Sequence, residues 1–90
     1  MARIVISDHA RFEMQRRGIS EDAVLEVALA PEQVVPSSGQ REIRQSLVED
    51  AATGKTTLLR LVVVRDEETI FVVTAYKTSK VEKCWRREVS

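Results

Sequence analysis

The 90-residue sequence has the size and composition of one small folded domain. Hydrophobic residues make up 43% of it, and a chain of this length buries about 60 to 65% of its unfolded surface on folding. We therefore expect a single domain over residues 1–90. Fourteen basic residues balance fourteen acidic ones, and the isoelectric point is near 6.6. This balance excludes attraction of a polyanion through net charge, so any nucleic-acid contact requires a local basic patch.

Cysteine usage and hydropathy predict a cytoplasmic protein. Cys84 is the single cysteine and cannot form an intramolecular disulfide, and the N-terminal residues lack the apolar run of a secretory signal. No segment approaches the roughly 18 apolar residues of a membrane span, since even 58–64 is interrupted by Arg60. One cysteine and one histidine are too few for a zinc site unless carboxylates or a second subunit contribute ligands. We expect no membrane contact, no metal and no cofactor.

The first 18 residues predict a short apolar segment and a helix. Residues 3–6 are either a strand or an apolar lead-in, and Ser7 or Asp8 then caps a helix that ends at Gly18. At about 100° per residue, the apolar side chains of this helix lie on both flanks of its polar ridge, which favours a partly covered helix. The helix also carries the imidazole and guanidinium side chains of His9, Arg11, Arg16 and Arg17.

A second helix follows at once. Ser20 precedes two acidic residues, which is typical of a helix start, and the helix is expected to run to about Ala30. Pro31 disfavours helical conformation in the residue before it. The wide apolar stripe of this helix indicates that it packs in the core.

The remaining sequence predicts an antiparallel sheet. Residues 33–35 form a short strand, and the polar segment 41–50 is typical of an edge strand. Residues 56–65 are apolar on both faces and belong to a central strand. The last strand, 69–77, alternates so that Phe71, Val73 and Ala75 share one face and Val72, Thr74 and Tyr76 the other.

Together these elements predict an α+β fold with two N-terminal helices on a sheet of about four strands, the helices covering one face and leaving the other free to bind a partner. After the sheet, Thr78 or Ser79 caps a short helix or the chain frays. This C-terminal segment, from Lys77 onward, has five basic residues against two acidic ones.

Two separated segments carry a family resemblance. His9-Ala10 is followed by Met14 and by Arg17-Gly18-Ile19-Ser20, and Val73-Thr74-Ala75-Tyr76-Lys77 comes later. In this order, spanning about Ile4 to Trp85, they resemble a widespread family of small bacterial proteins of unknown function that is grouped with RelE/ParE-type toxins. The resemblance implies the fold of barnase-like and RelE-like ribonucleases. It also implies an RNA-cleaving toxin, acting on RNA such as ribosome-bound mRNA and paired with an acidic antitoxin protein.

Cleavage of RNA without a metal requires particular side chains. A base takes the proton of the ribose 2′-hydroxyl, an acid protonates the leaving 5′-oxygen, and cations lie near the phosphorus. An imidazole exchanges protons near neutral pH, so His9 is the expected acid or base. Lys77 would stabilise developing charge and Tyr76 would position the ribose or stack on a base. Glu13 is an alternative base or, as we favour, an ion-pair partner of the neighbouring arginines.

The expected RNA-binding residues are Arg11, Arg16, Arg17, Thr74 and Lys80. They cannot all face one site, because Arg11 lies about 200° around the helix from His9 whereas Arg16 lies within about 20°. The structural alternative is that Tyr76 packs in the sheet and that the lysines are solvated.

The leading hypothesis is a RelE-like toxin, or an endoribonuclease derived from one, that cleaves RNA by metal-independent acid and base chemistry. The alternative is a non-catalytic module of the same fold that docks a protein or a nucleic acid on the free sheet face. Either protein can form a homodimer, in which the strand 41–50 pairs with its copy through its open edge.

Overall fold

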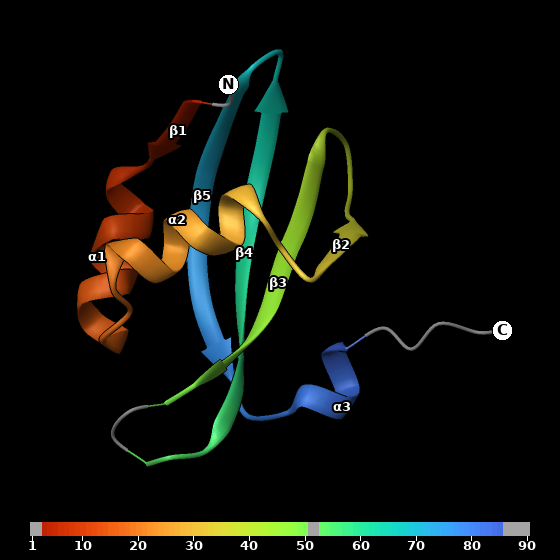
Figure 1. Cartoon of the computed structure of the whole chain (residues 1–90). Helices are drawn as coiled ribbons and strands as arrows, with labels where there is room; N and C mark the ends of the chain where they lie inside the picture. Colours follow the sequence, from red (N-terminus) through yellow and green to blue (C-terminus); the bar gives the residue numbers. More distant parts are fainter. Residues whose placement is uncertain (1–2, 51–52, 86–90) are drawn as a thin grey trace, which may run out of the picture.

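A mixed sheet forms the centre of the molecule, with helices on both sides (Figure 1). The computed structural model describes residues 3–50 and 53–85, and within these ranges there are five strands and three helices. The strands are β1 (Arg3–Ile6), β2 (Gln33–Pro36), β3 (Arg41–Glu49), β4 (Thr56–Asp66) and β5 (Thr69–Thr78). The helices are α1 (Asp8–Arg17), α2 (Glu21–Leu29) and α3 (Val81–Cys84). The predicted α+β class is confirmed.

The sheet differs from the predicted one by the addition of β1. The strand order is β1-β5-β4-β3-β2, and β1 pairs in parallel with the first half of β5, from Arg3 opposite Thr69 to Ile6 opposite Val72. The other neighbours are antiparallel. The apolar residues 3–6 are therefore a strand. The sheet of the described residues is five-stranded. It is mixed because β1 pairs in parallel along one half of the outer edge of β5.

The helices begin and end where the sequence predicted. The Ser7 hydroxyl oxygen accepts a hydrogen bond from the Ala10 amide at 3.0 Å, and Gly18 ends α1 in the left-handed region with φ of 66°. Ser20 caps α2 in the same way, accepting from the Ala23 amide at 3.2 Å. These caps satisfy amide groups that have no partner inside a helix.

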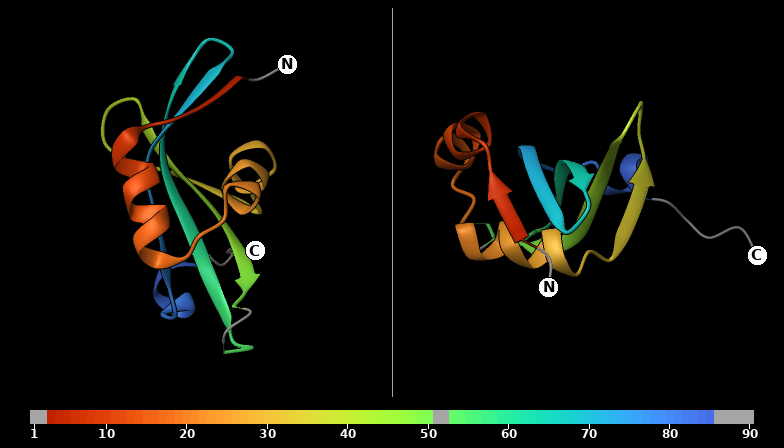
Figure 2. Two further views of the ribbon diagram at one scale, coloured as in Figure 1. Left: turned by 90° about the vertical axis from the view of Figure 1, so that its left-hand side faces the viewer. Right: turned by 90° about the horizontal axis from the view of Figure 1, so that it is seen from above.

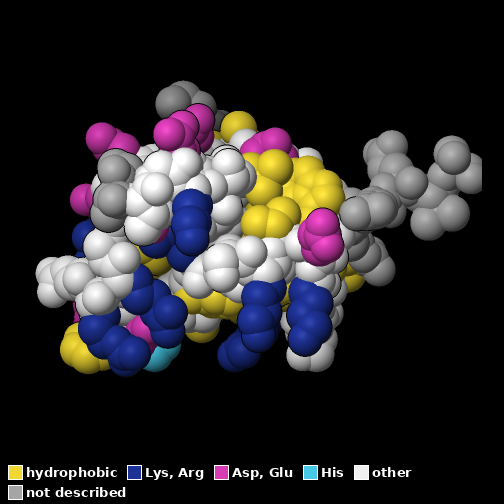
Figure 3. Space-filling view, turned by 90° about the horizontal axis from the view of Figure 1, so that it is seen from below, with side chains coloured by type: hydrophobic (Ala, Val, Ile, Leu, Met, Phe, Trp, Pro, Cys, Tyr) yellow, Lys and Arg dark blue, Asp and Glu magenta, His cyan; other side chains and the backbone are white. Residues whose placement is uncertain are grey.

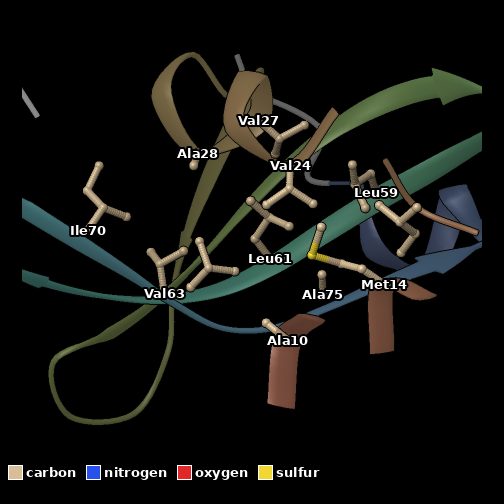
Figure 4. Packing of buried hydrophobic residues seen from close by; sticks show 12 residues of the cluster. Ala10, Met14, Val24, Val27, Ala28, Leu59, Leu61, Val63, Ile70 and Ala75 are labelled. Atoms are coloured by element: carbon tan, nitrogen blue, oxygen red, sulfur yellow. The ribbon is translucent and has the colours of Figure 1, made fainter. Parts of the chain in front are cut away.

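The hydrophobic core lies between α1, α2 and one face of the sheet (Figure 4). Ala10 and Met14 of α1 meet Leu61 and Ala75 there, with the apolar residues of α2 above them. Phe12, in contrast, is exposed. The expected apolar covering of α1 on both flanks is therefore wrong, since its buried apolar residues, Ala10 and Met14, lie on one side of the helix.

A β-bulge in β5 changes which of its residues share a face. Val62 lies opposite Thr74 and Val63 lies opposite Val72, so Val73 is an extra residue on β5. The extra residue reverses the alternation. Before the bulge Val72 faces the core, and after it Ala75 does. The predicted grouping of Val72 with Thr74 and Tyr76 is thus wrong. The residues on the face away from the core are Phe71, Thr74 and Tyr76.

Strand β3 is internal, not the predicted edge strand. It pairs with β4 along its length, and its residues 42–45 also pair with β2. The prediction failed because its polar residues are buried with partners, such as the Gln45 amide bound to Gln33 and the Ser46 hydroxyl bound to the Glu32 amide. This pairing with β2 also occupies the edge through which residues 42–45 would join a second copy.

The short helix α3 lies on the side of the sheet opposite α2 (Figure 2). It is held there by hydrogen bonds from Gln45 and Arg60 to Cys84. The second face is therefore partly covered, whereas we expected it to be free. The helix begins after Lys80, which has no side-chain cap, so neither Thr78 nor Ser79 is its N-cap. The basic residues 86 and 87 lie outside the described residues.

Candidate functional site

Helix α1 runs beside the half of β5 that β1 leaves unpaired (Figures 1 and 2). One flank of the helix faces α2, because the Arg11 guanidinium lies 3.2 Å from a carboxylate oxygen of Glu21 at the start of α2. Side chains at spacings of three and four residues share a flank. His9, Glu13 and Arg17 follow this spacing on the flank away from Arg11. This flank therefore faces the side of the sheet that α2 does not cover, which we call the open face.

An ion-pair cluster occupies this flank. Glu13 lies 3.0 Å from the Arg17 Nε atom and 3.6 Å from an Arg16 terminal nitrogen. The hydrogen bond from Arg17 holds the pKa of Glu13 below its ordinary value of 4.5, and the charges of Arg16 and His9 act in the same direction. The ion pair that we favoured for Glu13 is confirmed. Glu13 is a carboxylate at neutral pH, and it neutralises part of the charge of the two arginines.

His9 lies at the exposed edge of the same cluster. Its imidazole side chain forms no hydrogen bond and no salt bridge with any residue that the structure describes. Figure 3 shows dark-blue Lys and Arg side chains gathered around the cyan histidine, with a magenta carboxylate among them. The structure thus brings His9, Arg16 and Arg17 together, and it places Arg11 on the other flank.

Thr74 and Tyr76 face the open side from β5, as predicted. The Tyr76 hydroxyl accepts a hydrogen bond of 2.9 Å from an Arg60 terminal nitrogen, and the guanidinium carbon lies 5.7 Å from the centre of the tyrosine ring. This contact combines a hydrogen bond with a cation–π interaction. Tyr76 is therefore held in one position on the face.

Arg60 is a site residue that the sequence analysis missed. Its Nε atom donates to the Gln45 side-chain oxygen at 2.9 Å, and a terminal nitrogen lies 3.4 Å from the Cys84 sulfur. Gln45 is fully buried. The signal for it in the sequence is that Arg60 interrupts the most apolar strand of the chain.

Lys77 lies on the other side of the sheet from Tyr76. It is opposite Leu59 of the core face and lines a cavity of about 410 Å³ beside Gly18, Ile19 and Ser20. The two segments that carry the family resemblance therefore meet at this cavity. The Lys77 side chain forms no hydrogen bond or salt bridge with a described residue. The expected catalytic residues Lys77 and Tyr76 are thus separated by the sheet.

Lys80 lies at the start of α3 and is exposed. Because Cys84 of this helix contacts Gln45 and Arg60 of the open face, α3 belongs to the same side as the histidine cluster. Lys80 therefore lies at the start of a helix on the same side of the sheet as Arg16 and Arg17.

Among residues 3–50 and 53–85, no group of three or more His, Cys, Asp or Glu side chains is placed to hold a metal ion. In the same part of the chain, every helix is too short or too polar to cross a membrane.

Comparison with known proteins places this sheet and its helices in one family. A family model described as "Domain of unknown function (DUF4258)" matches residues 6–77. The chain belongs to this family. The match runs from the end of β1 to Lys77 and so includes α1 and the open face of β5. Searches of curated proteins and of solved structures found no match.

Proposed function

We propose that the protein is a RelE-like endoribonuclease that binds single-stranded RNA on the open face and cleaves it without a metal. The observation that carries the proposal is the common placement of His9, Arg16 and Arg17 on the α1 flank that faces this side, with Thr74 and Tyr76 on the neighbouring strand. An imidazole, two guanidinium groups and a hydroxyl-bearing aromatic residue are suited to phosphodiester chemistry.

The arginines of α1 would bind the phosphate. Guanidinium groups bind phosphate oxygens in pairs, and their attraction increases as the monoanionic phosphodiester becomes a dianionic phosphorane. In the absence of a ligand, the hydrogen bond from Arg17 lowers the pKa of Glu13. A phosphate that binds Arg17 would weaken this hydrogen bond. The release makes Glu13 a stronger base. Substrate binding would thereby activate a second proton-transfer group four residues from His9.

His9 would protonate the leaving 5′-oxygen while Glu13 takes the proton of the 2′-hydroxyl. In-line attack requires the base and the acid on opposite sides of the phosphorus, so the phosphate would have to lie between the Glu13 and His9 side chains. Tyr76, whose hydroxyl is fixed by Arg60, provides a ring on which an adjacent base can stack. All of these residues lie on the open face. Lys77 lies on the other side of the sheet and therefore takes no part in the reaction.

The test is cleavage of a labelled single-stranded RNA in the presence of EDTA. We expect His9→Ala to lower the rate by about 10²- to 10⁴-fold, with its circular dichroism spectrum unchanged. Arg11→Ala is the matched control, since it changes the same helix on the flank that faces α2. Intact RNA with folded wild-type protein, or equal rates for wild type and His9→Ala, would contradict the proposal. Arrest of a bacterial host that depends on His9 would support a toxin.

One observation favours a second function, a non-catalytic docking module. Val5 and Phe71 lie opposite each other in neighbouring strands on the open side, with exposed fractions of 36% and 40%. Exposed apolar neighbours are typical of a surface that a partner protein covers. A docking module predicts that any effect on a bacterial host persists in His9→Ala and is lost in Phe71→Ser.

A further inference from the structure

We infer that Arg60 binds a phosphodiester group at the centre of the open face. The inference rests on the proposed function, because it names the anion that this face takes. Arg60 lies on the central strand β4, opposite Tyr76 of β5 and Gln45 of β3. It is therefore in the middle of the sheet, half-buried, on the side that carries Thr74 and the histidine flank of α1.

The charge of Arg60 has no counterion among the described residues. The salt bridges of this part of the chain involve Arg11, Arg16, Arg17 and Arg44, and all partners of Arg60 are neutral groups. Partial burial of a charge without a counterion has a desolvation cost that neutral hydrogen-bond partners offset only in part. The hydrogen bonds and the cation–π contact fix the position of Arg60, but no carboxylate among the described residues balances its charge.

Arg44 shows how this sheet compensates an arginine that has only a structural role. It lies on the opposite face, is 7% exposed, and pairs with Glu42 at 3.0 Å while it donates to the Ala28 carbonyl oxygen at the end of α2. Arg44 therefore has both a counterion and a helix end to bind. Arg60 has neither of these, and it faces the side on which a ligand can supply the negative charge.

The hydrogen bonds of Arg60 leave donors for that ligand. Its Nε atom binds Gln45, and one terminal nitrogen binds Tyr76 and Cys84. The other terminal nitrogen has no partner among the described residues. A guanidinium has five N–H donors in a fixed plane. The bonds of Nε and of one terminal nitrogen fix this plane, and the second terminal nitrogen keeps two N–H donors for a ligand. Carboxylate and phosphate oxygens both suit this geometry, and the proposed RNA ligand supplies the phosphate.

The experiment follows the Nε–H resonance of Arg60 by NMR in the whole wild-type protein. One titration uses inorganic phosphate, and a second uses a 2′-O-methyl oligonucleotide, which cannot be cleaved. We expect both ligands to shift this resonance in a saturable way. Assignment comes from the loss of the resonance in Arg60→Lys, which keeps the charge and removes the planar group.

Affinity for the oligonucleotide is then measured against salt concentration for Arg60→Met and Arg65→Met. Arg65 is the matched control, because it lies on the same strand, opposite Ile70 of the core face. We expect Arg60→Met to weaken binding by about tenfold and to reduce the slope of log K against log salt by about 0.7. Arg65→Met should leave both unchanged.

The outcomes separate the inference from the proposed function. A shift with phosphate but no oligonucleotide binding supports an anion site at Arg60 and contradicts RNA as the ligand. Oligonucleotide binding that leaves the Arg60 resonance and the salt slope unchanged overturns the inference and retains the proposed function. If neither ligand shifts the resonance and no oligonucleotide binds, both are wrong.

Discussion

Ser7 connects the start of α1 to the bulge of β5. Its hydroxyl donates a hydrogen bond of 2.9 Å to the carbonyl oxygen of Val73, the extra residue of the bulge, and the same oxygen atom accepts from the Ala10 amide. The backbone amide of Ser7 also donates to the Val72 carbonyl oxygen at 3.0 Å. One side chain thus caps the helix and sets its position beside β5, on which the direction of the His9 flank depends.

Ser7→Ala should therefore cost more than the loss of a helix cap. We expect a decrease of about 2 kcal/mol in the free energy of unfolding, of which the cap accounts for about 1 kcal/mol and the bond to Val73 for the rest. Ser20→Ala is the control, because Ser20 caps α2 and should cost only about 1 kcal/mol. Urea denaturation measures both variants. Equal losses would show that the bond to the bulge contributes nothing.

Arg44→Met should destabilise the fold strongly. The change leaves Glu42 without its cation and the Ala28 carbonyl oxygen without its side-chain donor. We expect a loss of about 2 to 3 kcal/mol, because a nearly buried charge loses its partner. Arg65→Met, at an exposed position of β4, should change the free energy of unfolding by less than about 0.5 kcal/mol. A similar effect of both variants in urea denaturation would contradict this assignment.

The ion pair of Glu13 predicts a pH dependence of stability. The pKa of Glu13 is lower in the folded protein than its ordinary value of 4.5, so its stabilising contribution is present above that value and is lost as the pH falls through the folded pKa. We expect wild type to be more stable than Glu13→Gln at neutral pH. The difference in melting temperature should shrink below pH 4.5 and disappear in stronger acid.

The same comparison at high salt tests the cause of this dependence. The arginine partners of Glu13 are well exposed, and salt screens exposed charges. The advantage of wild type over Glu13→Gln at neutral pH should therefore decrease in about 1 M salt. An advantage that is independent of both pH and salt would indicate packing by the side chain and not its charge.

Lys77 and Arg17 should differ in their effects on RNA binding. Arg17 lies on the flank that faces the open side, whereas Lys77 lines the cavity on the side of α2. Arg17→Met should reduce the salt slope of oligonucleotide binding by about 0.7, and Lys77→Met should leave it unchanged. Filter binding over a range of salt concentrations gives both slopes. A larger decrease in the salt slope for Lys77→Met than for Arg17→Met would indicate that RNA binds at the cavity and not on the open face.

The ends of both main helices could be predicted because their signals are local. A hydroxyl before the first turn and a glycine after the last turn act within four residues, as Ser7, Gly18 and Ser20 show. The central place of β4 was also predictable, since a strand that is apolar on both faces is covered on both sides. The grouping of His9 with Arg16 followed from helical spacing alone.

The burial of polar residues was not predictable in the same way. Gln45 and Arg44 resemble edge-strand residues in the sequence, yet they are buried because Gln33, Arg60 and the end of α2 provide their partners. These partners are at least 12 residues away along the chain. Such a partner can be identified only when the strand register is known.

The sequence by itself determined the α+β class, the helix boundaries, the central strand and the flank of α1 that carries His9, because each depends on residues within a few positions of one another. Only the tertiary structure decided that Arg60 supports Tyr76 and that Lys77 faces the other side. One extra residue, Val73, reverses the alternation of β5. A bulge of this kind depends on pairing between strands and on the bond from Ser7, 66 positions away.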